Sequence, residues 1–347
     1  MDLEKLWSTL TERLGGEQRF LGAFLSGSRA SGLDHKHSDT DIHVILRDGD
    51  RLRRRTFDVD GVEVQLTRLS LDQVAEFADL TSEYVATASD RTQSRLTSEQ
   101  LWRISRLATA RVIYVSDQCA ALLKRSNADV TRQVLMANYA HRVGRAAEDA
   151  MGVLASGDPV GAAYATNVAL RCAFEVTAAG SGHLYALEHF LLRRIASMPA
   201  LSGSLGDFWS LLHQWPAHDD VRSLQHDIES RLLVANLLVG WSLLYGWSAP
   251  LTGLPRFDQA GVGPRRAPGF GLQRFADCWA LAGPTSTLRI SKRVAVVWVH
   301  LNGQSLNDVT GAVVNAGYPD ASQHDVVSCV ANLIRLGAAK SDAPMSP

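Results

Sequence analysis

The stretch from Phe20 to Leu46 constrains the fold more than any other part of this chain of 347 residues. Phe20 to Leu25 is a short apolar run that stops at Ser26-Gly27-Ser28, and Ile42 to Leu46 is a second such run. Short apolar runs bounded by turn-forming residues are typical of buried strands. We therefore predict a strand, a tight turn that opens a helix, and then a second strand.

The flanking segments extend this pattern into a small sheet with helices. Thr56 to Val59, Asp60-Gly61 and Val62 to Leu66 predict a β-hairpin, because Asp-Gly supplies the positive φ of a tight primed turn. Leucines at helical spacing before Gly15-Gly16 predict an amphipathic first helix. Two helices and a strand are expected at Leu71 to Leu80, Ser98 to Ala108 and Arg111 to Val115.

From about residue 121 to residue 250 the apolar periodicity is that of helices only. Leu232 to Trp247 is shorter than the roughly 20 residues that cross a bilayer and contains polar residues, so we interpret it as a buried helix. Arg171 and Glu175, four residues apart, are expected to pair on a helix surface. Three apolar stripes mark helices: Met136, Ala140, Val143, Ala147 and Met151; Ala162, Ala165, Ala169, Cys172 and Val176; Leu184, Leu187, Leu191 and Ile195.

The C-terminal quarter begins with a stretch rich in glycine and proline. Residues 251–275, with Arg265-Arg266 among those glycines and prolines, are expected to form an exposed linker. In residues 276–347, the β-branched run Val294 to Val299 is strand-like, and helices are expected from Ser305 to about Ala316 and from Ser322 to Leu336. The patterns together predict an α+β fold: a mixed-sheet domain over 1–120, an all-helical domain over 121–250, the linker, and a small domain over 276–347.

Composition excludes several classes of protein. A hydrophobic content of 46% excludes a mainly disordered chain. The 35 Lys and Arg residues are balanced by 36 Asp and Glu residues, so the protein has no overall positive charge to attract duplex nucleic acid or an anionic membrane. Any nucleic-acid contact has to be local. The cysteines Cys119, Cys172, Cys278 and Cys329 lie far apart, which favours buried thiols in a reducing cytoplasm. The charged first helix is unlike a secretory leader, so we expect a cytoplasmic location.

The chemistry is concentrated between Gly27 and Asp41. A Gly-Ser turn at a helix start aims backbone N–H groups and the Ser28 hydroxyl at a ligand, which favours an anion such as a triphosphate. Asp39 and Asp41 are two residues apart on a strand, so their carboxylates emerge on one face and can jointly hold Mg²⁺. Taken alone, the Gly-Ser pair is better explained as an ordinary turn, and the two aspartates as a solvated strand end, because both patterns are common. Their order and spacing together favour a phosphate and metal site.

Three histidines, His35, His37 and His43, also lie near the acidic pair. Their spacing differs from that of zinc-binding helices, so we interpret the loop histidines as solvated. Arg29 is expected either to contact phosphate or to cap a surface turn.

This motif resembles that of the nucleotidyltransferases of the DNA polymerase β superfamily, above all the minimal and antibiotic-modifying branch. Leu25 would be the leading hydrophobic residue, Gly27-Ser28 the turn, and Asp39-Thr40-Asp41-Ile42 the carboxylate strand. The resemblance implies a two-ion Mg²⁺ site on Asp39 and Asp41. It also implies binding of an NTP, ATP first among them, by Gly27, Ser28, Arg29 and Ser38.

One departure from the family pattern affects the expected chemistry. The third carboxylate of the family stands on the following strand, and Gln65 occupies that place in Gly61-Val62-Glu63-Val64-Gln65. Glu63, two residues earlier on the same strand face, is the candidate replacement, and Asp58 and Asp60 are less suitable because they precede the turn. The third acid serves the attacking hydroxyl and the second ion, so its loss means either a substitute or a degenerate enzyme.

The resemblance is weaker outside the motif. The segment from Gly182 to Leu192 looks like one carried by antibiotic nucleotidyltransferases, whose helical domains supply acceptor-binding acids. Residues 276–347 resemble a winged-helix or PqqD-like peptide-recognition domain, and a packing or dimerisation unit is the equal alternative. The charged residues of the helical region considered for the acceptor are Arg145, Glu148, Asp149, Arg171 and Glu175.

Two functional hypotheses follow from the sequence. The first is an enzyme that moves an NMP group, AMP first among them, to a hydroxyl of a small molecule or of a natural-product or peptide acceptor and releases pyrophosphate, with Asp39, Asp41, Glu63 and Gln65 forming the catalytic centre. The second is a regulatory protein that binds the nucleotide without turnover, which Gln65 favours. We expect no membrane partner, and a homodimer is left open.

Overall fold

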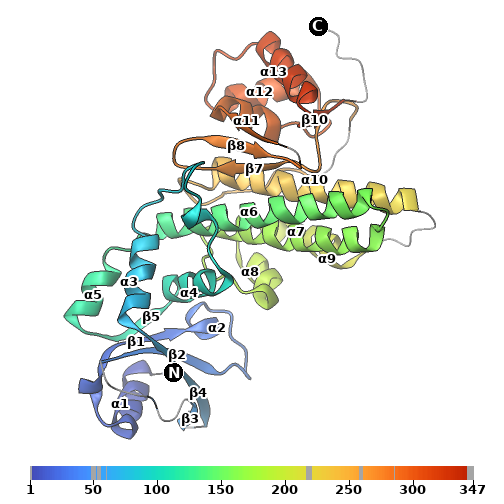
Figure 1. Ribbon diagram of the computed structural model, residues 1–347. Helices are drawn as coiled ribbons and strands as arrows, with labels where there is room; N and C mark the ends of the chain where they lie inside the picture. The colour runs from blue at the N-terminus through green and yellow to red at the C-terminus, as the bar shows by residue number, and fades with distance from the viewer. Residues whose placement is uncertain are drawn as a thin grey trace. The chain divides into compact units, whose positions relative to one another are not determined.

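The computed structural model describes residues 2–47, 52, 56–59, 61–215, 221–257, 261–284 and 286–341. Its chain forms two compact units (Figure 1). The sheet unit comprises Met1–Tyr84, Leu96–Val134 and Leu184–Arg193, and the helical unit comprises Val85–Arg95, Leu135–His183 and Arg194–Pro347. The chain therefore crosses between the units several times, whereas the sequence analysis places sequential boundaries at residues 120, 250 and 275.

The sheet unit is built on a mixed five-stranded sheet in the order β3-β4-β2-β1-β5. Strand β2 runs parallel to β4, and the other neighbouring pairs are antiparallel. This mixed sheet agrees with the α+β fold expected from the sequence. The strands are β1 (Phe20–Ser26), β2 (Thr40–Leu46), β3 (Thr56–Val59), β4 (Val62–Leu69) and β5 (Arg111–Val115).

One face of this sheet carries the hydrophobic core of the unit. Helix α1 (Leu3–Leu14) buries Leu6, Trp7 and Leu10 against alternate strand residues such as Ile42 and Val44. Because successive strand side chains point to opposite faces, the intervening residues of β2 face the other side. The apolar alternation of β2 thus directs the polar side chain of Asp41 away from the α1 core.

The opposite face is covered by helices whose ends are marked in the sequence. Helix α2 (Gly27–Ala30) follows β1 directly, as predicted, and has four residues. Helices α3 (Leu71–Leu80) and α4 (Ser98–Ala108) both begin with capping boxes, at Ser70 and Thr97, in which the side chains of Gln73 and Gln100 complete the cap. Helix α5 (Asp117–Leu123) follows β5.

The predicted hairpin is confirmed in the residues that the structure describes. Strands β3 and β4 pair in antiparallel register from Thr56 with Gln65 to Val59 with Val62. Gly61 has a φ of 77°, as a tight turn of this kind requires. Asp60, the first residue of the predicted turn, lies outside the described residues.

The helical unit contains long helices that pack along one another (Figure 1). They are α6 (Ala128–Ala155), from Leu135 onward, together with α7 (Pro159–Gly180), α9 (Leu205–His213) and α10 (Val221–Tyr245). Helix α10 is long and apolar enough to cross a membrane by length and composition, but 72% of its most apolar window is buried within the structure. The prediction of a buried helix at Leu232 to Trp247 is therefore confirmed, although the helix ends at Tyr245.

The prediction of a helix from Leu184 to Ile195 is wrong for the first half of this segment. Residues 184–187 form no helix, Glu188–Phe190 is one 3-10 turn, and α8 spans only Leu191–Ser197. The backbone N–H of Ala186 donates to Ser105 Oγ of α4 at 2.6 Å instead of joining a helical ladder. Tertiary contact with α4 has therefore overridden the local periodicity.

The surface position expected for Glu175, as the partner of Arg171, is also wrong. Glu175 is 5% exposed and makes a bidentate ion pair with Arg194, at 2.8 Å for both nitrogen to oxygen contacts. Arg194 is fully buried in the helical unit. The two parallel hydrogen bonds between the guanidinium and the carboxylate offset part of the cost of burying both charges.

The C-terminal part of the helical unit combines a second sheet with three helices. Strands β7 (Gly271–Arg274), β8 (Trp279–Ala282) and β9 (Thr287–Ile290) form an antiparallel meander. The run Val294 to Val299, expected to be a strand, lies in helix α11 (Lys292–Val299), with Ser291 as N-cap. Because Ala295 to Val299 are all buried, the run has no polar face from which its period could be read. Helices α12 (Leu306–Asn315) and α13 (Gln323–Arg335) match the prediction.

Residues 265–274, expected to lie in an exposed linker, are instead packed. Strand β6 (Arg265–Arg266) pairs with β10 (Ala339–Lys340), and Arg266 is 1% exposed. The Arg266 guanidinium donates to the backbone oxygens of Val299 and Leu233 and stacks on Trp298. Gly263 packs so closely that a Cβ there would meet Gln304 O at 1.9 Å. The glycines thus serve close packing here, not flexibility.

We expect native trypsin to cleave the chain after Arg256 before it cleaves after Arg266. Arg256 is exposed in a segment without helix or strand, whereas Arg266 is buried and its strand is paired. Timed digestion followed by mass spectrometry of the fragments tests this order. A first fragment that begins at Ala267 would contradict the packing described here.

Candidate functional site

The sheet unit contains a cavity of about 980 Å³. It lies on the sheet face opposite α1, at the ends of β1, β2 and β4, and one wall comes from residues 185–190, far along the chain. Charged and polar side chains dominate its lining. The lining includes Ser28, Arg29, His35, Lys36, His37, Ser38, Asp39, Asp41, Glu63, Gln65, Arg106, Tyr185 and His189.

Asp39 and Asp41 face this cavity together, as their spacing predicts. Asp39 immediately precedes β2, and Asp41 is the second residue of this strand. Thr40, between them, is fully buried. Burial, followed by the nearby charge of Asp41, raises the pKa of the Asp39 carboxyl above its ordinary value. The pair therefore forms a region of negative charge that a cation would stabilise.

Gly27 allows the close contact between the turn and the carboxylate strand. Its φ is 78°, and a Cβ atom at this position would lie 2.3 Å from Asp41 Oδ2 and 2.8 Å from Arg106 Nη1. Both the backbone conformation and the space therefore require glycine. Ser28, 8% exposed, follows at the cavity wall, as predicted from the sequence.

Arg29 and Ser38 are brought to the cavity, and both hold the loop before β2. Arg29 Nε donates to Asp39 O at 2.9 Å, its Nη2 donates to Ser38 O, and its Nη1 lies 3.4 Å from Asp34 Oδ2. Ser38 Oγ accepts from the backbone N–H of His35 at 2.9 Å. Arg29 therefore holds the backbone of the loop that precedes β2.

Gln65 stands beside Asp41 in the sheet. The parallel register of β2 and β4 pairs Asp41 with Gln65, so the amide occupies the place next to the carboxylate. Gln65 Nε2 donates to Glu63 Oε1 at 3.0 Å. Glu63, on the same strand face, also raises the pKa of Asp39, after burial and Asp41. The amide therefore orients a carboxylate that is electrostatically coupled to the acidic pair.

Arg106 of α4 is the main site residue that the sequence analysis missed. Its Nη1 lies 2.6 Å from Asp41 Oδ2 and 3.4 Å from Ser26 Oγ, and its side chain is 12% exposed. The guanidinium lies over the rings of Trp102 and Tyr185, at 5.2 and 5.6 Å. The sequence offered no local signal for this contact, because α4 carries no acid three or four residues from Arg106 and Asp41 lies 65 residues away.

The histidines divide into two groups. His35 and His37 are exposed at the cavity rim, in agreement with their expected solvation. His43 is 1% exposed and stacks on Trp102 with ring centroids 5.5 Å apart. Burial, followed by the charge of Arg106, lowers the pKa of His43 to about 4, so this ring is neutral near pH 7. His43 is thus part of the support beneath the site.

The donor set limits what metal the site can take. In the described part of the chain, no group of three or more His, Cys, Asp or Glu side chains is placed to hold a metal ion by itself. Asp39 and Asp41 offer carboxylate oxygens only, which suit a hard ion such as Mg²⁺ that keeps water and takes other ligands from a substrate. The two carboxylates fit a Mg²⁺ ion whose remaining ligands are water and substrate oxygens, and they do not by themselves complete its coordination.

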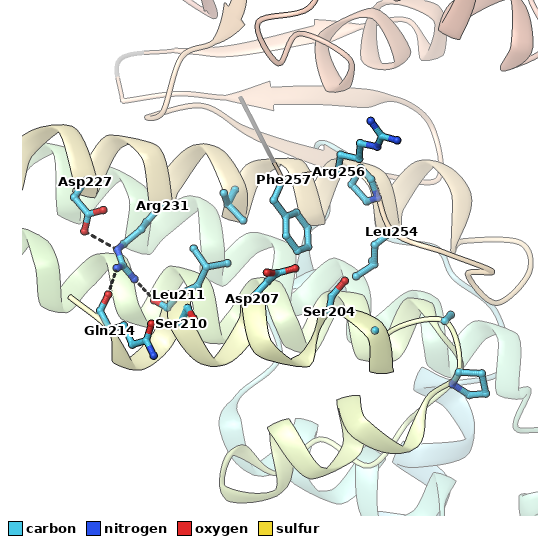
Figure 2. A pocket seen from close by; sticks show the side chains of 15 residues that line it. Ser204, Asp207, Ser210, Leu211, Gln214, Asp227, Arg231, Leu254, Arg256 and Phe257 are labelled. Carbon is cyan, nitrogen blue, oxygen red and sulfur yellow. Dashed lines mark hydrogen bonds and ion pairs between the residues drawn. The ribbon is translucent and has the colours of Figure 1, made fainter. Parts of the chain in front are cut away.

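A second cavity, of about 1050 Å³, lies in the helical unit between α9, α10 and residues 254–257 (Figure 2). Its buried cation, Arg231, is fully used: Nε binds Asp227 at 2.8 Å, and its terminal nitrogens donate to the backbone oxygens of Leu211 and Gln214. The side chain also stacks on Trp215. Arg231 therefore holds the C-terminal end of α9 in place.

We expect Gly27→Ala to destabilise the protein more than Gly32→Ala. Both glycines have positive φ, which costs an alanine about 1–2 kcal/mol, but a Cβ at Gly32 meets nothing within 4 Å. The clash of the Gly27 Cβ with Asp41 adds about 1–3 kcal/mol. Urea unfolding of both variants measures the difference in the free energy of unfolding. Equal losses would show that Gly27 and Asp41 are not in contact.

Comparison with solved structures finds chains of similar fold. The chain is similar to the crystal structure of a nucleotidyltransferase-like protein from Exiguobacterium sibiricum 255-15, with a TM-score of 0.41 and 13% identity. The match covers 71% of this chain and 77% of that chain. No protein-family model matches the sequence, and no curated protein matches it either. A likeness this loose assigns no activity, so function has to be argued from the residues of the cavity.

Proposed function

We propose that this protein is a Mg²⁺-dependent nucleotidyltransferase that moves an NMP group from an NTP, ATP first among them, to an acceptor hydroxyl and releases pyrophosphate. The acceptor is a small molecule or a natural-product or peptide substrate. The observation that supports this most is the position of Asp39 and Asp41, side by side in a cavity whose other walls carry Arg29, Lys36 and Arg106.

The charge pattern of the cavity suits a polyphosphate better than a neutral or cationic ligand. Two carboxylates would repel a triphosphate unless a divalent cation lay between them, and the cationic side chains supply the complementary charge for the remaining phosphate oxygens. Ser28 adds a hydroxyl donor at the turn. A cavity of about 980 Å³ also has room for a nucleotide and part of an acceptor.

The reaction is a displacement at the α-phosphorus. The acceptor oxygen forms a bond to this atom, the bond to the bridging oxygen breaks, and pyrophosphate leaves with the bonding electrons. Asp39 and Asp41 would hold Mg²⁺, which would neutralise charge on the phosphate oxygens. The protein contributes orientation: Gly27 lets the turn approach Asp41, and Arg29 fixes the backbone from which Asp39 projects.

Glu63 is the group proposed to receive the proton of the acceptor hydroxyl. It lines the cavity near the acidic pair, and its Oε1 accepts a hydrogen bond from Gln65 at 3.0 Å, which fixes the orientation of the carboxylate. In this arrangement the family's third acid is replaced by an amide and carboxylate pair on the same strand. The site then still contains one general base, the Glu63 carboxylate, two residues before the position of the family's third acid.

A second function is favoured by the same strand. Gln65, in register with Asp41, cannot bind a second cation as a carboxylate does. A protein with one metal-binding pair and no third acid would bind nucleotide without turnover and act as a regulatory nucleotide-binding protein. Pyrophosphate release in the presence of Mg²⁺ separates this alternative from the enzyme.

We expect Asp39→Asn and Asp41→Asn each to lower Mg²⁺-dependent transfer to background, because the neutral amide cannot replace the charge that binds the cation. Pyrophosphate release from ATP with a panel of hydroxyl acceptors measures the loss. Asp58→Asn is the matched control, since Asp58 is an exposed strand carboxylate outside the cavity and Asn can still accept from Gly61 N. Full activity of a folded Asp39 or Asp41 variant would refute the metal site.

We expect Glu63→Gln to slow the chemical step by about 10²-fold or more, with little change in ATP affinity, because only the proton acceptor is removed. Gln65→Asp should be neutral or harmful, since it places a second charge against Glu63. Single-turnover rates at saturating ATP and Mg²⁺ compare the two variants. If Glu63→Gln has no effect and Gln65→Asp accelerates transfer, the protein is a weakened relative without a working base.

A further inference from the structure

Arg106 carries an interaction that the proposed transfer reaction leaves unexplained. Its Nη1 binds Asp41 Oδ2 at 2.6 Å, so a cation of the protein already contacts a carboxylate assigned to Mg²⁺. The contact lies in the cavity and joins partly exposed groups, with side-chain exposures of 12% for Arg106 and 22% for Asp41. A guanidinium at this oxygen and a divalent cation at the same oxygen repel each other.

A neighbouring arginine on the same helix shows what a purely structural ion pair looks like here. Arg103 is held by two carboxylates, Glu76 at 2.6 Å and Glu99 at 2.9 Å, and it does not line the cavity. Arg106, one turn along α4, has a single carboxylate, and its buried Nε has no hydrogen-bond partner among the described residues. The buried Arg194 and Arg266 also have an unpaired Nε, so what distinguishes Arg106 from Arg103 is its single carboxylate partner and its place in the lining of the cavity.

The surroundings of Arg106 allow its head group to change partner. Trp102 and Tyr185 hold the guanidinium by contact with their rings, at 5.2 and 5.6 Å, and such contacts do not depend on one hydrogen-bond direction. Ser26 Oγ lies at 3.4 Å, which is a weak contact. The planar fork of arginine is also suited to phosphate oxygens.

We propose that Arg106 competes with the divalent cation for Asp41 and, when the cation binds there, turns its guanidinium to a phosphate oxygen of the nucleotide. Arg106 is then a positioning residue with two roles: it weakens metal binding in the absence of nucleotide, and it strengthens nucleotide binding once the metal is present. Metal and nucleotide would therefore bind cooperatively. This inference rests on the proposed function, because it takes Asp41 as a metal ligand.

The test measures Mn²⁺ binding by calorimetry or electron paramagnetic resonance, with no nucleotide present. Arg106→Gln removes the charge, Arg106→Lys keeps it, and Arg103→Gln is the matched control on the same helix. We expect Arg106→Gln to bind Mn²⁺ about tenfold more tightly than the unmodified protein, or more, because a competing cation is gone. Arg106→Lys and Arg103→Gln should remain near the unmodified value. A gain in affinity cannot come from misfolding.

ATP binding in the presence of Mg²⁺ tests the second role. We expect Arg106→Gln to bind ATP about tenfold more weakly, the scale of a lost hydrogen bond to a charged group, and Arg106→Lys to recover part of the loss. Equal Mn²⁺ affinity in Arg106→Gln and the unmodified protein overturns the competition, and unchanged ATP affinity overturns the phosphate contact. If Asp41→Asn does not alter Mn²⁺ binding at all, the metal site of the proposed function is itself wrong.

Discussion

The parallel pairing of β2 with β4 is the constraint on which the site depends. It brings Asp41 into register with Gln65 and places Glu63 on the same sheet face, although the β3 strand intervenes in the sequence. The alternation of β2 sends Ile42 and Val44 to the α1 core and leaves Asp41 on the other side. A shift of one residue in this register would bury the carboxylate and expose the core, so hydrophobic packing and site geometry are determined by the same ladder.

Charge balance in the cavity follows from this geometry. Asp39, Asp41 and Glu63 lie close enough for each of the other two to raise the pKa of Asp39. Two arginines lie near these carboxylates and have different contacts. Arg29 binds backbone oxygens and the Asp34 carboxylate, and so holds the loop. Arg106 binds the Asp41 carboxylate directly. Gly27 contributes through its lack of a side chain, because a Cβ atom there would collide with Asp41. The site is thus a balance of opposite charges around one carboxylate.

The helical unit is stabilised by arginines used in a different manner. Arg194, Arg231 and Arg266 are all nearly or fully buried, and they bind a carboxylate, helix-end carbonyls or both. Arg266 shows the cost of such burial most clearly, because burial lowers its pKa to about 9 although backbone oxygens and the face of Trp298 contact the guanidinium. These side chains tie together segments distant in the sequence, and their roles in the unit are structural.

The sequence by itself determined the elements whose signals are local. Turn residues, alternation and caps predict the hairpin that contains Gln65, the strand that follows Asp39 and contains Asp41, and the capped helices α3, α4 and α13. Only the tertiary structure decided features that depend on distant partners. It buried Arg266, made Val294–Val299 helical, left residues 184–187 without helix and brought Arg106 to Asp41. Periodicity cannot report these outcomes, because a fully buried run has no polar face and an ion pair across 65 residues leaves no local pattern.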